Sequence, residues 1–187
     1  SRLTLGGGVR QEWRAAPGEG DERDSTTVGH GSAAYEAADA SFELLARRML
    51  GTVPKFFVVT YFDVKVEQRS RNGSGSEMLT TAVVKVKVGN ETLISAAEGN
   101  GPVNALDLAL RKDLGKYQSY ISALELTDYR VRILNSGTEA VTRVLIESTD
   151  EAGERWTTVG VSPNIIDASF QALMDSIVYK LVRSGAP

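Results

Sequence analysis

The first block of alternating hydrophobic and polar positions begins at Phe56 and predicts three strands followed by a helix. Valines alternate with lysines from Val84 to Val88, as expected of a half-buried strand. A loop over 69–76 precedes this strand, and Gly89-Asn90 predicts a tight turn into the next one. A helix is then predicted to begin at Pro102. The residues that this helix is predicted to bury are Val103, Leu106, Leu110 and Leu114.

A second block repeats this order about sixty positions later. Strands are predicted over 121–134, 140–149 and 155–161, with turns at 135–139 and 150–154. The closing helix is predicted to bury Ile166, Phe170, Leu173, Ile177 and Leu181.

The repeat defines the predicted fold class. Gly99 and Pro102 of the first copy match Gly160 and Pro163 of the second. One-sided sheets must bury their apolar faces, so we predict an α+β fold of two pseudo-symmetric βββα units packed together and preceded by a linker helix. The repeat domain is predicted over 56–183, with its two units at 56–116 and 120–183. The apolar load of the last helix further predicts a homodimer.

The region before the repeats divides in two. Residues 1–29 are rich in glycine and charge, and we interpret them as a linker or disordered arm. Residues 30–54 predict a linker helix with Ser32 as its N-cap and with Gly51 and Pro54 ending it. Its predicted buried stripe is Tyr35, Ala38, Phe42, Leu45 and Met49. The helix is expected to pack on the repeat domain, on another domain or on another chain.

The amino-acid composition and net charge argue against several classes of function. A net charge of -3 with 24% charged residues offers no basic surplus for nucleic acid or an anionic membrane. No run approaches a membrane span and the N-terminus lacks the apolar core of a signal peptide, so a cytoplasmic location is expected. The chain has no cysteine and one histidine, His30, which argues against thiolate catalysis, a paired-histidine metal site or a catalytic triad. Carboxylate pairs such as Asp150 and Glu151 are expected to be solvated, so no catalytic and no metal residue is predicted.

Several stretches resemble a known family. GNGPVNALDLALRK, LTDYRVRIL and VTRVLIESTDEAGERWTTVGVSPNIIDASFQAL are similar to the C-terminal regulatory domain of the 2-isopropylmalate and citramalate synthases, over residues 56 to 183. YEAADASFELLARR resembles the linker helix of the citramalate branch, which leads toward isoleucine. The resemblance implies a parent acyltransferase whose metal-dependent barrel condenses acetyl-CoA with a 2-oxo acid and is inhibited by the end-product amino acid. The divalent metal and acetyl-CoA are expected in that catalytic barrel, and no cofactor is expected in this fragment.

A branched-chain amino acid effector, isoleucine or leucine, needs N–H donors for its carboxylate and an apolar pocket for its side chain. The turn before the first helix offers open backbone and a helix N-terminus, and the family's effector site resembles positions on the second repeat. The predicted effector-binding residues are Gly99, Gly101, Val103, Asn104, Leu126, Tyr129, Ile133, Thr138 and Ala140. A plain turn and ordinary core residues explain the same sequence, and a ligand-free dimerisation module or a sensor for unrelated enzymes stays open.

Overall fold

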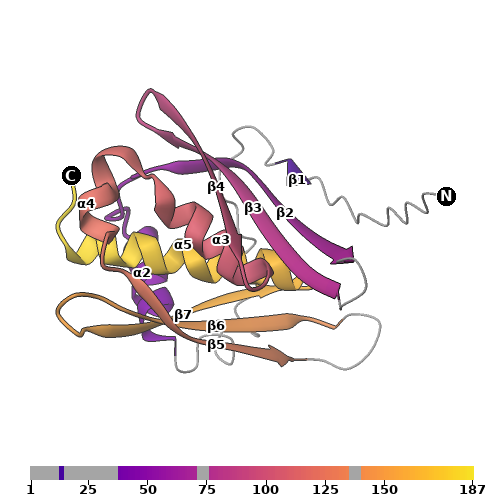
Figure 1. Cartoon of the computed structure of the whole chain (residues 1–187). Helices are drawn as coiled ribbons and strands as arrows, with labels where there is room; N and C mark the ends of the chain where they lie inside the picture. The colour runs from indigo at the N-terminus through magenta and orange to yellow at the C-terminus, as the bar shows by residue number, and fades with distance from the viewer. Residues whose placement is uncertain (1–12, 15–37, 71–75, 135–139) are drawn as a thin grey trace. The chain divides into compact units, whose positions relative to one another are not determined.

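The computed structural model describes residues 13–14, 38–70, 76–134 and 140–187 (Figure 1). By its internal contacts the chain divides into two compact units, residues 1–17 with 57–115 and residues 18–56 with 116–187. The expectations for Ser32, Tyr35 and His30, and for the turn at 135–139, lie outside the described residues.

The first unit is an antiparallel sheet carrying one helix. Its strands are β2 (Val58–Ser70), β3 (Ser76–Val88) and β4 (Glu91–Gly99), and the short β1 (Trp13–Arg14) pairs with β2 to give the order β1-β2-β3-β4. Helix α3 (Pro102–Lys112) follows β4 and packs on β3 and β4. The predicted alternation in β3 is confirmed, because Val84, Val86 and Val88 are buried while Lys85 and Lys87 are exposed.

The second unit repeats the order of strands and helix. A turn of 3-10 helix (Gly115–Tyr117) and α4 (Gln118–Ile121), neither predicted, lead into β5 (Glu125–Ile133), β6 (Thr142–Thr149) and β7 (Arg155–Ser162). The sheet order is β5-β6-β7, and α5 (Ile165–Arg183) packs on β6 and β7. The two βββα units and the α+β class predicted from the sequence are confirmed.

The burial predicted for the two closing helices is confirmed at most positions. In α3 and after it, Leu106, Leu110 and Leu114 are fully buried, while Val103 is half-buried. In α5 the buried leucines and isoleucine are Leu173, Ile177 and Leu181, while Ile166 and Phe170 are half-buried. Among the described residues, no helix is long and apolar enough to cross a membrane.

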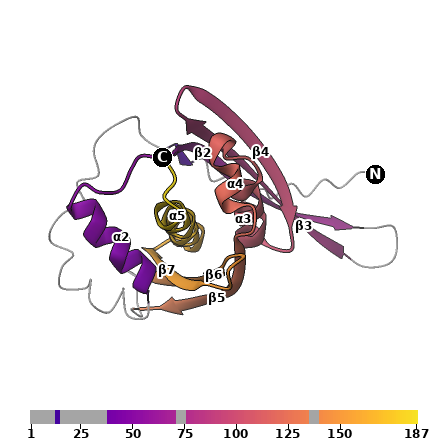
Figure 2. The same ribbon diagram turned by 90° about the vertical axis from the view of Figure 1, so that its left-hand side faces the viewer.

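Helix α2 (Asp39–Met49) packs on α5 and β7 of the second unit, which is one of the three alternatives left open by the sequence (Figure 2). The predicted buried stripe is wrong at Phe42 and Met49, which are 61% and 82% exposed. Ala38 is fully buried as predicted and Leu45 is half-buried, while Leu44, which was not predicted to face inward, is fully buried. The helix therefore turns a face of small residues and Leu44 toward its unit, and its bulkier apolar face lies at the surface.

Candidate effector site

A glycine at or near the end of the last strand in each unit lets the closing helix approach the sheet closely. A Cβ atom on Gly99 would lie 2.5 Å from the backbone nitrogen of Ala105, and one on Gly160 would lie 1.8 Å from the carbonyl oxygen of Ala168. Ala105 and Ala168 are each the fourth residue of their helix. Packing alone therefore requires both glycines, and Gly99 has a structural role whether or not it contacts an effector.

The two helix N-termini differ in how they are capped. The N-cap of α3 is Gly101, whose backbone is extended and which supplies no side-chain hydrogen bond. The N-cap of α5 is Asn164, whose Oδ1 accepts hydrogen bonds from the backbone N–H groups of Ile166 at 2.8 Å and Asp167 at 3.4 Å. An asparagine side chain thus occupies in the second unit the position that glycine leaves open in the first.

This difference corrects the repeat alignment made from the sequence. Pro102 is the first residue of α3, whereas Pro163 precedes the N-cap of α5. Gly160 lies inside β7, two residues before its end, while Gly99 ends β4. The second copy therefore has two extra residues between its glycine and its helix, and Asn164 is the true counterpart of Gly101. Asn164 stands directly before the apolar run of α5, and an asparagine in that position is an N-cap signal readable from the sequence.

The first-unit candidates surround the open N-terminus of α3. Gly101 has nothing within 4 Å of an added Cβ, so its surroundings are open. The Oδ1 of Asn104 accepts a hydrogen bond from the backbone nitrogen of Asn100 at 3.1 Å and orders the turn before the helix. Val103 is half-buried beside it. These groups offer helix N–H donors to an anionic group such as a carboxylate.

The second-unit candidates share one face of β5. In the ladder with β6, Leu126 pairs with Ser148, Tyr129 with Ile146 and Ile133 with Thr142, across a bulge near Leu126. Ile146 and Ser148 are buried on the side of the sheet that faces α5, because the Ser148 Oγ lies 2.6 Å from the Ser176 Oγ of that helix. The three β5 side chains therefore belong to the helix-facing side.

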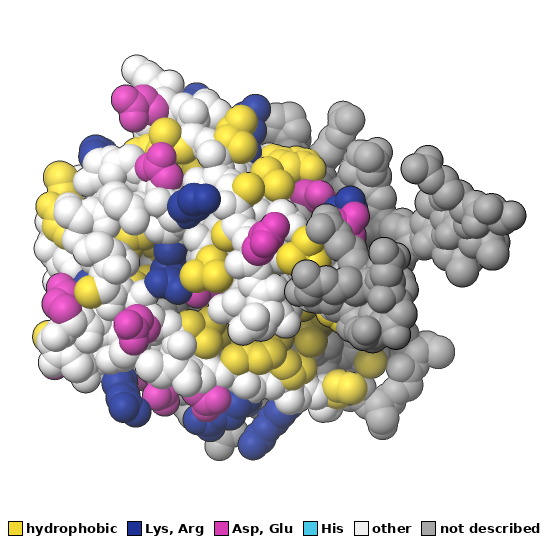
Figure 3. Space-filling view, in the orientation of Figure 1, with side chains coloured by type: hydrophobic (Ala, Val, Ile, Leu, Met, Phe, Trp, Pro, Cys, Tyr) yellow, Lys and Arg dark blue, Asp and Glu magenta, His cyan; other side chains and the backbone are white. Residues whose placement is uncertain are grey.

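Tyr129 contacts α5 directly. Its hydroxyl lies 3.2 Å from the Ser169 Oγ, within hydrogen-bonding distance. Ile133 is 69% exposed, so nothing in its own unit covers it fully, and Figure 3 shows apolar side chains at the surface over the part of the molecule where β5 and β6 run. Ala140 is half-buried just before β6, and Thr138 lies outside the described residues. The two groups of candidates belong to separate units, so their meeting in one pocket stays a prediction.

A second polar site, which was not predicted from the sequence, lies at the other end of α5. Lys180 Nζ contacts Asp150 Oδ2 at 2.8 Å and Glu151 Oε2 at 3.3 Å, and the side chains of Lys180 and Asp150 are 8% and 10% exposed. Asp150 was expected to be solvated, and this expectation was wrong. The lysine comes from the helix and the carboxylate from the turn after β6, which are distant in sequence.

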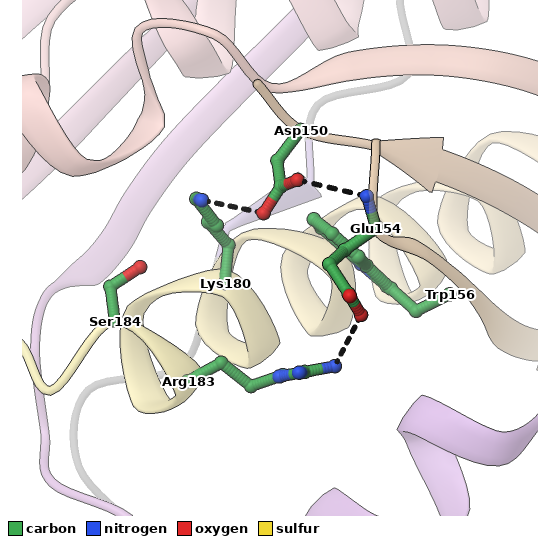
Figure 4. Close-up of a pocket in the computed structure, with 6 residues that line it drawn as sticks. All are labelled: Asp150, Glu154, Trp156, Lys180, Arg183 and Ser184. Atoms are coloured by element: carbon green, nitrogen blue, oxygen red, sulfur yellow. Dashed lines mark hydrogen bonds and ion pairs between the residues drawn. The ribbon is translucent and has the colours of Figure 1, made fainter. Parts of the chain in front are cut away.

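Figure 4 shows the hollow around this ion pair, with Arg183 reaching Glu154 at 3.4 Å. The hydrogen bond from Lys180 lowers the pKa of Asp150 and outweighs the opposite effect of burial. Burial alone would lower the pKa of Lys180, but its hydrogen bonds to Asp150 and Glu151 outweigh burial and raise it. Both groups therefore stay ionised, and the pair joins the β6–β7 turn to the last turns of α5. Among the described residues, no group of three or more His, Cys, Asp or Glu side chains is placed to hold a metal ion.

The fold and these sites define a duplicated βββα domain with one open and one filled helix N-terminus. The family model for the LeuA allosteric (dimerisation) domain matches residues 36–181. The chain therefore belongs to the LeuA allosteric (dimerisation) domain family.

Full-length relatives agree with this assignment. The chain is 53% identical to the (R)-citramalate synthase of Geobacter sulfurreducens over 80% of this chain and 28% of that protein. It is 47% identical to the (R)-citramalate synthase of Synechocystis sp. over 79% of this chain and 27% of the relative. The similarity to the 2-isopropylmalate synthase of Pectobacterium atrosepticum is lower, at 34% identity over 65% of this chain and 20% of the relative. The chain thus spans less than a third of the length of these relatives.

Proposed function

We propose that this chain is the effector-binding regulatory domain of a citramalate synthase and that isoleucine is its effector. The observation that carries the proposal is the difference in identity, 53% to a citramalate synthase against 34% to a 2-isopropylmalate synthase. The parent protein is then an acyltransferase that condenses acetyl-CoA with pyruvate, and its divalent metal and its acetyl-CoA site belong to a catalytic barrel outside this fragment. The alternative effector is leucine, as expected for a 2-isopropylmalate synthase domain.

The site supports an amino acid as the ligand. Its carboxylate is proposed to meet the open N-terminus of α3 at Gly101, where glycine leaves room and no side chain caps the helix. Its branched side chain is proposed to pack against Tyr129 and the exposed Ile133 of β5. The filled N-terminus of α5 leaves no equivalent place for a carboxylate, so we propose one effector site per chain.

Binding is tested by calorimetry and by thermal unfolding of this chain with isoleucine, leucine and valine in turn. A ligand at a hundredfold excess over its Kd stabilises the folded chain by about 2.7 kcal/mol, so the correct amino acid raises the melting temperature. An apolar pocket separates isomers by about 1 to 3 kcal/mol, so the preferred amino acid is expected to bind tens of times more tightly. If none of the three amino acids gives a binding heat or raises the melting temperature, the result favours a dimerisation module without a ligand.

The position of the site is tested by two variants and a control. Gly101→Trp is expected to fold, because the backbone is extended and the added side chain meets open space, and to block the carboxylate. Tyr129→Ala is expected to remove one pocket wall. The matched control is Tyr61→Ala, a partly exposed tyrosine of β2. If both site variants keep the full ligand-induced shift, the named pocket is wrong.

We also propose that the chain forms a homodimer and that it has no synthase activity by itself. Light scattering is expected to give twice the 20.1 kDa mass of one chain at micromolar concentration, and a stable monomer would contradict the proposal. Incubation with acetyl-CoA, pyruvate and magnesium or manganese is expected to release no free CoA. Metal-dependent release above background, in a preparation free of host synthase, would refute the second claim.

A further inference from the structure

Helix α2 is held on the second unit by hydrogen bonds from Ser41 and Arg48 to Asp175 of α5, a group of contacts called here the Asp175 latch. The Ser41 hydroxyl donates to Asp175 Oδ2 at 2.7 Å, and Arg48 donates to Asp175 Oδ1 at 2.8 Å. Both carboxylate oxygens are therefore occupied by partners from α2, one turn or more apart on that helix. The side chain of Asp175 is 15% exposed and Ser41 is buried, so water competes little for their hydrogen bond, whereas the Arg48 side chain is 31% exposed.

The same helix also covers the outer edge of β7. The Ser41 hydroxyl accepts a hydrogen bond from the backbone nitrogen of Val159 at 2.9 Å, and Asp39 Oδ1 accepts one from that of Thr157 at 3.0 Å. β7 is an edge strand in the order β5-β6-β7, so these side chains satisfy backbone donors that a neighbouring strand would otherwise take. Ser41 thus joins α2, β7 and α5 through a single oxygen atom.

Helix α5, which carries Asp175, also contacts a residue of the candidate effector site. Tyr129, proposed above to wall the effector pocket, contacts Ser169 of α5 at 3.2 Å. Ser169 and Asp175 lie on the same helix, within two turns of each other, and a helix transmits a displacement over that distance as a rigid rod. Every contact in this path lies inside one unit.

We propose that effector binding at Tyr129 displaces α5 through Ser169, and that this displacement changes the hydrogen bonds of the Asp175 latch. Helix α2 is then the element whose position responds to the effector, and we call this path the relay. The inference rests on the proposed function, because it takes Tyr129 as part of the effector site. It assigns to Asp175, Ser41 and Ser169 a coupling role outside the ligand pocket. Movement of α5 relative to the sheet is carried to α2, the element of the unit that precedes the repeats in sequence.

The latch is tested without ligand by hydrogen exchange on this chain. Asp175→Ala is expected to speed the exchange of the α2 amides at least tenfold, while the amides of β6 keep their protection. The control is Met49→Gln, since Met49 lies on the same helix and is 82% exposed. Equal α2 exchange in the two variants would overturn the latch.

The relay is tested by adding isoleucine or leucine at saturation. In the unmodified chain the α2 amides are expected to change their exchange rate on binding, and in Ser169→Ala, which leaves Tyr129 in place, this response is expected to disappear while calorimetry still detects the ligand. A full α2 response in both Ser169→Ala and Asp175→Ala, with ligand bound, refutes the relay. If no branched-chain amino acid binds the unmodified chain, the proposed effector function and the relay built on it fail together, and the ligand-free experiment still decides the latch.

Discussion

Replacing Gly160 with alanine is predicted to destabilise the second unit strongly. The added Cβ would lie 1.8 Å from the carbonyl oxygen of Ala168 and 2.7 Å from its carbonyl carbon, whereas real Cβ atoms essentially never come within 3.0 Å of such neighbours. Both neighbours are backbone atoms of α5, so no side-chain rotation relieves the clash. The helix must retreat from β7 by more than an ångström.

The size of the effect follows from what that retreat breaks. Thr158 Oγ1 donates to the carbonyl of Ala172 at 2.8 Å, and Gln171 Oε1 accepts from the backbone nitrogen of Val161 at 3.2 Å, both between β7 and α5. Overpacking costs about 1–3 kcal/mol and each lost hydrogen bond about 0.5–1.5 kcal/mol. We therefore expect a loss of about 3–5 kcal/mol in the free energy of unfolding of this unit.

The assay is urea unfolding followed by the fluorescence of Trp156, which is 3% exposed and lies in β7. The chain has two tryptophans, so a Trp13→Phe background makes Trp156 the single reporter of the second unit. With an m-value of about 2 kcal/mol/M, the midpoint is expected to fall by about 1.5–2.5 M. Gly101→Ala is the control, because its Cβ meets open space and its backbone is extended. A midpoint within about 0.25 M of the parent for Gly160→Ala would refute the packing argument.

Three further predictions concern capping and charge. Asn164→Ala is expected to lower the free energy of unfolding in urea by about 1 kcal/mol, because α5 loses its N-cap. Gly101→Asn is expected to stabilise α3 by a few tenths of a kcal/mol and to weaken amino-acid binding measured by calorimetry. Unchanged affinity in Gly101→Asn would contradict a carboxylate at that N-terminus. Lys180→Met is expected to cost about 1–3 kcal/mol at pH 7, because it leaves a nearly buried Asp150 without its cation. Folding lowers the pKa of Asp150 from its ordinary 3.8 and raises the pKa of Lys180 from its ordinary 10.5. The ion pair therefore stabilises the fold fully between pH 3.8 and pH 10.5. This stabilisation is lost as the pH falls further into the acid range, where Asp150 is protonated, and as it rises above 10.5, where Lys180 loses its proton. Unfolding of the Lys180→Met variant and its parent at pH 7 and pH 3 checks this, and an equal difference at both pH values would contradict it.

Local sequence patterns were enough to predict the order of strands and closing helix in each βββα unit and the buried face of β3. Alternation from Val84 to Val88 has one solution in a sheet, because its period of two residues matches a strand and puts every valine on the same side. Pro102 likewise began α3 as predicted, since proline lacks the N–H that the first turn leaves unpaired anyway. Repetition of this local pattern was enough to predict two βββα units, because each signal is contained within a few neighbouring residues.

Which faces of the helices and strands are buried depends on contacts between segments distant in sequence. Helix α2 carries two apolar faces at helical spacing, and periodicity alone does not show which of them is buried. The face with Ala38, Ser41 and Leu44 packs inward, because small side chains and a hydroxyl allow close approach to α5 and to the edge of β7. The pairing of Lys180 with Asp150 was equally hidden, since thirty positions of chain separate them and only the packing of α5 on its sheet brings them together. Local periodicity fixes what each element is, and contacts between distant segments fix which of its faces is buried.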